Sequence, residues 1–331
     1  MTTETATANE VKRRRPSVRI PPVYYFLVVI LLVGIILDNL FASGNILTNP
    51  TILTNILVRS VALGIVAVGQ TFVIIGASID LSVEYNISLT AVLASLFMLG
   101  DPARVPMSLA IVFGVGALIG LVNGLIITKL EVNPFIATLG TGLIIKGILN
   151  GTFANYKGAV PDSFQFFGYE SLGPIPISVW ILLIVVVIGW FILAWTKFGA
   201  HLYGVGGSRI LARLSGLRTS RVIIGAHIFC SITAVLSGLF IVSRLGSGAP
   251  WVGPDGVYAL ESVAVVVIGG TALSGGRGGV FGTLAGVLIF GVLDTVFNQL
   301  GIDTYLKTVF RGAIVILAVA SYSIRSDREV S

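Results

Sequence analysis

Long apolar segments alternate with short polar ones along most of the chain, and this pattern predicts membrane-spanning helices. A helix needs roughly 20 mainly apolar residues to cross the hydrocarbon layer, and the segment 175–195 carries no charge at all. About ten spans are predicted, over residues 22–41, 60–79, 81–99, 107–128, 134–152, 177–196, 222–243, 257–273, 279–300 and 304–323. The pattern therefore indicates an all-α integral membrane protein.

The composition excludes a soluble fold. Of the 331 residues, 55% are hydrophobic and only 11% are charged, whereas soluble domains carry roughly 25% charged residues. The single cysteine, Cys230, lies in an apolar stretch, so no disulfide can form within the chain.

The distribution of Lys and Arg predicts the orientation of the spans. Residues 1–20 are polar and contain the basic run 12–15, so we expect a disordered cytoplasmic tail. If the spans alternate from there, most of the 21 Lys and Arg residues fall on the cytoplasmic side. Both termini are therefore expected in the cytoplasm. The membrane domain would cover 21–324, with a cytoplasmic loop over 197–221 and a short tail over 325–331.

Small residues predict close helix packing in the fourth span. Gly116, Gly120 and Gly124 recur every four residues, and Gly114 lies just before them. Small residues on one face of a span let two helix backbones approach closely. We interpret these glycines as a packing surface rather than a binding site.

No enzyme motif is present. The sequence lacks a GxxxxGK[ST] phosphate loop and an HExxH zinc motif, and its two histidines, His201 and His227, are far apart. We therefore expect no catalytic residue, no metal site, no cofactor in this chain and no nucleic-acid partner.

The turn between the second and third spans is polar. Asp80 is placed to cap the N-terminus of the third span, and Glu84 in the first turn would complement the helix dipole. The alternative is that this turn lines a polar pathway, where irregular backbone is tolerated within a membrane protein.

One carboxylate lies well inside a predicted span. Asp294 is four residues before Asn298, so the two share one helix face. A carboxylate there needs a partner or a cavity, and either a structural pair with Arg311 or a cavity-facing role is consistent with the sequence. Asp38 and Glu261 lie near span ends and are expected to be solvated.

The large loop 197–221 contains a short amphipathic helix. Residues 206–216 read GGSRILARLSG, in which Ser208 can cap the N-terminus and Gly216 the C-terminus. Three apolar residues fall on one face and two arginines on the other. Such a helix could lie on the membrane surface or dock in the groove of a cytoplasmic protein, and spacing alone does not decide between them.

Four stretches together resemble one family, the permease subunits of bacterial ABC sugar importers of the ribose/xylose/arabinose type. They are IDLSV at 79–83, NPFIATLGT at 133–141, ARLSGL at 212–217 and IGGTALSGGRGGVFGTLAGVLIFGVL at 268–293, in the family's order and covering roughly 55–320. Ala77, Ser78 and Glu84 depart from the glycines usual in the first motif, and Ser208 replaces a common Asn. These changes bear on the substrate more than on the fold.

The resemblance implies a division of labour. Two permease subunits, alike or different, would form the pathway in the bacterial inner membrane, surrounded by lipid. A separate cytoplasmic ATP-binding subunit would hydrolyse ATP, and an extracytoplasmic sugar-binding protein would deliver the substrate. The loop helix would then be the coupling helix that seats in the ATPase. Its expected contact residues are Ser208, Arg209, Ile210, Leu211, Arg213, Leu214 and Gly216.

A monosaccharide needs hydrogen-bonding groups along its path. The candidate lining residues are Asp80, Asn86, Asn133, Thr138, Thr271, Asp294 and Asn298. Import of branched-chain amino acids by the same machinery is an alternative, but few ionisable residues are present to match two charges on the substrate. A stand-alone secondary transporter is a further alternative, although it would not need the loop helix.

Overall fold

The computed structural model describes residues 21–41, 49–153, 155–303, 305–313 and 316. The predicted tails 1–20 and 325–331, and much of the predicted span 304–323, lie outside the described residues. The described residues are mainly helical, and the strands among them form one short hairpin of two residues each, β1 (Ser171–Leu172) and β2 (Ile175–Pro176). The longer helices are α1 (Pro22–Phe41), α2 (Pro50–Ile75), α3 (Val83–Met98), α4 (Val105–Lys129), α5 (Pro134–Thr152), α7 (Ile177–Trp195), α8 (Lys197–Gly207), α10 (Thr219–Leu245), α12 (Tyr258–Ile268) and α13 (Val280–Gln299).

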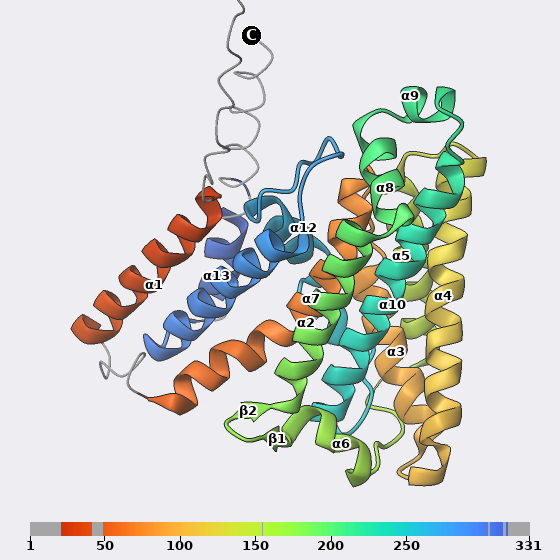
Figure 1. Cartoon of the computed structure of the whole chain (residues 1–331). Helices are drawn as coiled ribbons and strands as arrows, with labels where there is room; N and C mark the ends of the chain where they lie inside the picture. The colour runs from red at the N-terminus through yellow and green to blue at the C-terminus, as the bar shows by residue number, and fades with distance from the viewer. Residues whose placement is uncertain (1–20, 42–48, 154, 304, 314–315, 317–331) are drawn as a thin grey trace, which may run out of the picture.

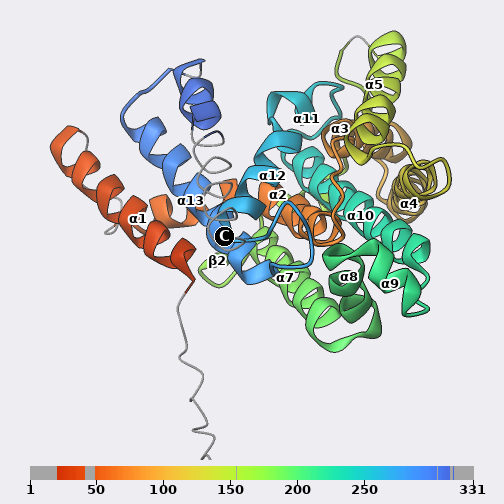
Figure 2. The ribbon, with the colours of Figure 1, turned by 90° about the horizontal axis from the view of Figure 1, so that it is seen from above.

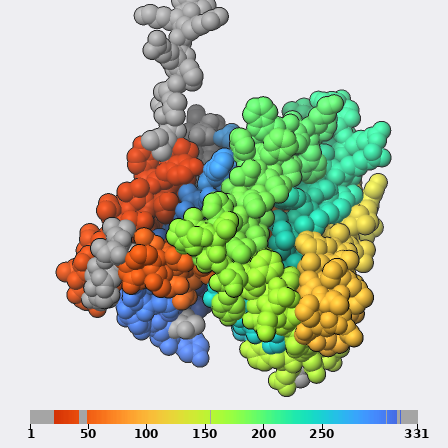
Figure 3. Space-filling model, turned by 60° about the horizontal axis from the view of Figure 1, so that its bottom comes forward, coloured from red at the N-terminus to blue at the C-terminus, as the bar shows by residue number. Residues whose placement is uncertain are grey.

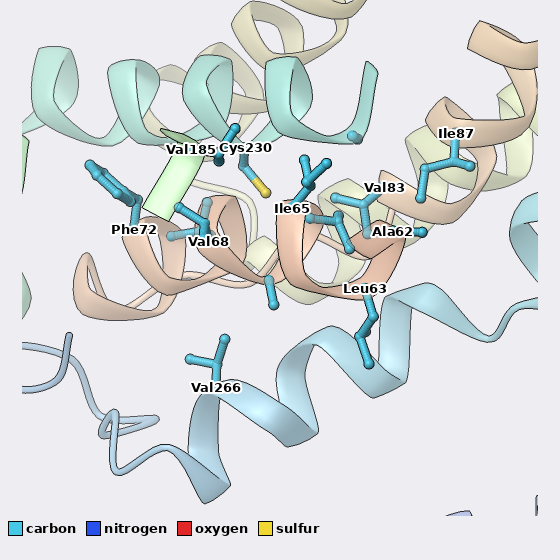
Figure 4. Packing of buried hydrophobic residues seen from close by; sticks show 14 of the residues in the cluster. Ala62, Leu63, Ile65, Val68, Phe72, Val83, Ile87, Val185, Cys230 and Val266 are labelled. Carbon is cyan, nitrogen blue, oxygen red and sulfur yellow. The ribbon is translucent and has the colours of Figure 1, made fainter. Parts of the chain in front are cut away.

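The bundle is built around α2 and α10, which pack against each other at its centre (Figures 1 and 2). α10 also contacts α3 and α4, whereas α2 also contacts α7, α12 and α13. Side chains from these helices form one continuous apolar core, which Figure 4 shows around Ile65, Phe72 and Cys230. α1 lies on the outer side of α13, at the flank of the bundle opposite α5.

The glycines of α4 make a close contact with a neighbouring helix, as predicted. A Cβ on Gly120 would lie 2.5 Å from the carbonyl oxygen of His227, and one on Gly124 would lie 2.6 Å from Cα of Ile224, both in α10. Because no side chain intervenes, the two backbones are nearly in contact. Gly114, by contrast, faces open space and takes no part in this contact.

Seven helices in the described residues are long and apolar enough to cross a membrane: α1, α2, α4 with the preceding 3₁₀ turn Pro102–Arg104, α5, α7, α10 and α13. Two further predicted spans are shorter helices, because α3 has 16 residues and α12 only 11. At about 1.5 Å per residue, α12 is about 16 Å long, well short of the roughly 30 Å hydrocarbon core. The predicted count of ten is therefore not established by helix length.

Helix boundaries follow local capping signals. α5 begins at Pro134, as predicted, because Oδ1 of Asn133 accepts the N–H of Phe135 at 2.9 Å. α2 begins ten residues before its predicted start for the same reason, with Asn49 as the capping residue before Pro50.

The two ends of the bundle differ. One end carries α8 and the short α9 (Arg209–Leu214), and we call it the α9 end; the other carries α6 (Asp162–Tyr169) and the β-hairpin, and we call it the α6 end (Figure 1). Figure 3 brings the α6 end forward.

The loops at the α6 end are joined through one serine. Ser95 of α3 lies with its Oγ 2.7 Å from the carbonyl oxygen of Lys157 and accepts the N–H of Gly248 at 3.0 Å. Lys157 and Gly248 also exchange two backbone hydrogen bonds, of 2.9 and 3.1 Å. The segments before α6 and after α10 are therefore fixed to α3 and to each other.

Candidate functional site

The amphipathic helix predicted in the large loop is present as α9. Oγ of Ser208 accepts the N–H of Leu211 at 3.3 Å and so caps the helix, and Gly216 ends it with φ +80°. On its outer face, Ile210, Leu211 and Leu214 are 74%, 65% and 79% exposed. Three apolar side chains therefore project away from the bundle with nothing covering them among the described residues.

Basic residues surround this apolar face. Arg209 and Arg213 both line a cleft beside Asn133, at the start of α5. Burial and the nearby charge of Arg213 lower the pKa of Arg209. Two clustered cations beside exposed apolar side chains favour a partner with an apolar groove and an acidic border.

α9 is connected to the interior of the bundle through a tight backbone junction at Gly206, the second-last residue of α8. A Cβ on Gly206 would lie 1.7 Å from the carbonyl oxygen of Ile75 and 2.7 Å from the backbone N of Gly276. That carbonyl accepts the N–H of Gly276 at 2.9 Å. Near the α9 end, the end of α2, the end of α8 and the loop between α12 and α13 therefore meet backbone to backbone.

Asp80 belongs to a buried polar cluster. Its Oδ1 accepts the N–H of Ser82 at 3.0 Å and the hydroxyl of Ser82 at 2.6 Å. Its Oδ2 lies 3.1 Å from Nδ1 of His227, whose Nε2 lies 2.9 Å from Oγ of Ser78. Nδ2 of Asn123 donates to Oγ of Ser82 at 2.9 Å. This cluster ties the turn between α2 and α3 to α10 and α4.

The cluster corrects one prediction. The N-cap position of α3 is occupied by Ser82, not Asp80, whose carboxylate is fully buried against His227 instead. Glu84 does lie in the first turn of α3, as predicted. His227 and Asn123 were not predicted as members of this cluster, although an ionisable or amide side chain within a span signals a polar partner.

Two further pathway candidates lie near this cluster. Thr138 accepts the N–H of Leu81 at 3.1 Å, which fixes α5 to the α2–α3 turn. Asn86 donates to the carbonyl of Ser231 at 3.2 Å, and its own Oδ1 is buried without a hydrogen-bond partner among the described residues.

The remaining candidates are dispersed. Asn133 caps α5 and is exposed near the α9 end. Thr271 is fully buried in the loop after α12, where Gly278 packs against it. The predicted lining residues therefore do not form a single site.

Two of the predicted lining residues, Asp294 and Asn298, line the same cavity. Asp294 is ion-paired with Arg311 at 2.5 Å, and Arg311 also lies 2.8 Å from Glu261 of α12. Lys307 donates to Oδ1 of Asn298 at 2.6 Å. The sequence left open either a structural pair with Arg311 or a cavity-facing position for Asp294. The structure shows both, because Asp294 is paired with Arg311 and also lines the cavity. The predicted solvation of Glu261 and Asp38 is wrong, because both are buried, at 6% and 1% exposure.

No metal centre is evident in the described part of the chain, where no three His, Cys, Asp or Glu side chains are arranged to hold an ion.

A bundle of apolar helices that encloses polar clusters and a charged cavity, and that exposes an amphipathic helix at one end, defines a polytopic membrane transport protein. Residues 52–319 match the family described as branched-chain amino acid transport system / permease component. The chain belongs to this family of permeases, and it is a multi-pass protein of the bacterial inner membrane.

Similar proteins include several sugar permeases. The chain is 33% identical over 326 residues to the ribose import permease protein of Escherichia coli K12, covering 96% of this chain and 98% of the relative. It is 35% identical over 315 residues to that of Bacillus subtilis 168, covering 91% of each chain. It is 33% identical over 327 residues to the galactose/methyl galactoside import permease protein of Salmonella typhimurium LT2, covering 93% of this chain and 95% of the relative. No solved structure matches the chain.

Proposed function

We propose that the chain forms the translocation pathway of an ATP-driven importer for a monosaccharide or a similar small polar solute. The observation that carries this proposal is the exposed apolar face of α9, formed by Ile210, Leu211 and Leu214. A permease that hydrolyses no ATP itself must receive motion from another subunit, and an uncovered amphipathic helix is a suitable contact for it. The partner would be a separate cytoplasmic ATP-binding subunit.

The orientation follows from the positive-inside rule. Lys129, Arg213, Arg218 and Arg221 gather near α9, so we propose that the α9 end faces the cytoplasm. The α6 end would then face an extracytoplasmic sugar-binding protein. Ten spans with both termini inside would comprise the seven long helices, the shorter α3 and α12, and a last span over 304–323.

The cargo is inferred from the relatives and from charge. Two of the similar proteins are named as importing ribose and galactose or its methyl glycoside. In this chain, the Asp80 and Asp294 carboxylates are already paired with His227 and Arg311, so neither of these two carboxylates is free to bind an ionic substrate. The family description names branched-chain amino acids, which keeps an amino acid as the second candidate.

α5 is our candidate for contact with a second permease subunit, identical or related. It exposes Lys146 and Asn150, and Cβ positions on Gly147 and Gly151 would meet nothing within 4 Å. Exposed polar residues in a span need a partner, and open small residues allow a close one. The remainder of the surface would face lipid. We propose no cofactor in this chain and no nucleic-acid partner.

Co-purification of the chain with the ATP-binding subunit tests this proposal. Leu214→Asp places a charge on the exposed face, and burying one leucine contributes about 1.5–3 kcal/mol. The variant should therefore weaken the association by about tenfold or more. Leu172→Asp is the matched control, because Leu172 is a similarly exposed leucine (67%) at the α6 end. Normal recovery of the ATP-binding subunit with Leu214→Asp would refute the assignment of α9.

A further inference from the structure

A charged cavity of about 290 Å³ lies between α2, α12, α13 and the residues that follow α13. Six charged side chains line it: Arg59, Asp255, Glu261, Asp294, Lys307 and Arg311. Arg59 lies on α2 about 24 Å along the helix from Ile75, the residue that meets Gly206 near the α9 end. The cavity is therefore on the half of the bundle nearer the α6 end.

The charges in the cavity balance one another. Three of the six side chains are acidic and three are basic. Arg311 contacts the carboxylates of both Glu261 and Asp294. A charged solute would have to separate these pairs, whereas a neutral solute can add hydrogen bonds to them.

Hydrogen-bonding capacity remains unused in this cavity. Nη1 of Arg311 approaches Oε1 of Glu261 to 2.8 Å as an ion pair. Nevertheless, neither Nε of Arg311 nor Oε1 of Glu261 has a hydrogen-bond partner with acceptable geometry among the described residues. A buried polar atom that makes no hydrogen bond is destabilising. Glu261 is 94% buried, so bulk water has little access to its carboxylate. A solute that enters the cavity can supply the missing hydrogen-bond partners.

We propose that this cavity is a binding site for a neutral polyhydroxylated solute, the first site that such a solute occupies within the permease. This inference rests on the proposed function and extends it to particular residues. Vicinal hydroxyls would donate to the carboxylates of Glu261 and Asp294 and accept from Arg311 and Lys307. The rings of Tyr258 and Phe290 also line the cavity. The volume is at the small end of the range for small-molecule sites, about 300–1,000 Å³, which suits one monosaccharide.

Uptake kinetics provide the first test, in membranes that contain the complete transporter. The probes are radiolabelled D-ribose, D-galactose and L-leucine. Glu261→Gln and Asp294→Asn should each raise the apparent KM for a sugar about tenfold, since a hydrogen bond to a charged group contributes about 1.5–3 kcal/mol. Asp101→Asn is the control, because Asp101 is an exposed aspartate outside the cavity. An unchanged KM in both cavity variants would overturn the proposal.

Cysteine labelling provides a second test, which does not require the ion pairs to be altered. The native Cys230 is fully buried, so a membrane-impermeant thiol reagent should report only a cysteine introduced by Asn298→Cys at the cavity rim. We expect D-ribose or D-galactose to slow this labelling, but not to slow labelling of a Leu172→Cys control. Absence of protection by any sugar, or protection by L-leucine alone, would overturn the site. If the parent transporter takes up sugar but sugar gives no protection, the site is refuted and the proposed function is not. If the parent transporter takes up no sugar, the proposed function itself is refuted.

Discussion

The close backbone contact at Gly206 predicts that adding a single methyl group there lowers the stability of the protein. In Gly206→Ala, the added Cβ would lie 1.7 Å from the carbonyl oxygen of Ile75, whereas carbon and oxygen atoms in contact are normally about 3.3 Å apart. One of the two backbones must therefore move by about 1.6 Å. Gly207→Ala is the matched control, because a Cβ at this neighbouring residue of α8 would meet nothing within 4 Å.

The size of the effect follows from two terms. Overpacking in a tightly packed interior costs about 1–3 kcal/mol. Displacing the carbonyl of Ile75 also breaks its hydrogen bond to Gly276, now 2.9 Å long, which adds about 1 kcal/mol. Together they predict a loss of about 2–4 kcal/mol, or a melting temperature lower by on the order of 5–10 °C. Gly207→Ala should leave stability unchanged or slightly higher, because alanine favours the helix.

Thermal unfolding of the purified variants in one detergent measures this difference. If α9 drives the rest of the bundle through this junction, Gly206→Ala should also reduce ATP-dependent uptake more than it reduces the amount of assembled transporter. Equal melting temperatures for the two alanine variants would refute the reasoning, because they would show that the α8 and α2 backbones are not in close contact.

Three further predictions concern the interior. Gly120→Ala should lower stability by about 1–3 kcal/mol, since its Cβ would lie 2.5 Å from a carbonyl oxygen of α10. Gly114→Ala should leave stability unchanged, because Gly114 faces open space. Equal melting curves for the two variants would contradict this prediction. Asp80→Ala should lower the free energy of unfolding by about 2–4 kcal/mol, because it leaves buried donors unpaired. In a double-mutant cycle, this loss should be smaller when His227 is already alanine. Additive losses would show that the two side chains do not interact. Ser95→Ala should speed amide hydrogen exchange in the loops around residues 157 and 248, and unchanged protection there would show that its hydroxyl does not hold them.

The apolar pattern predicted the helices whose ends carry local signals. α1 and α5 match their predicted bounds, and for α5 Asn133 and Pro134 mark the start. α2 was predicted too short because its first turns, from Pro50, are only moderately apolar, although the same Asn-Pro signal precedes them. α12 was predicted too long because the apolar character continues past Ile268, where the backbone turns at glycines.

The polar contacts were harder to predict because they join distant parts of the chain. Asp80 and His227 are 147 residues apart, and no local pattern relates them. The Asp294–Arg311 pair was foreseen as one option because the two are close in sequence and both lie in apolar surroundings. Glu261 was taken as solvated because it lies near a span end, but that end is covered by the residues after α13. Exposure near a helix end depends on what packs there, which a single sequence does not reveal.

The hydrogen bonds around Ser95 have a consequence for the entropy of association. A free loop loses about 1–2 kcal/mol per residue when its backbone becomes ordered, and this loss normally opposes docking. At the α6 end, the segments around Lys157 and Gly248 are already fixed to α3 and to each other. A protein that docks on this end therefore meets a preorganised surface. Calorimetry should accordingly find little unfavourable conformational entropy, and Ser95→Ala should make the entropy of docking less favourable.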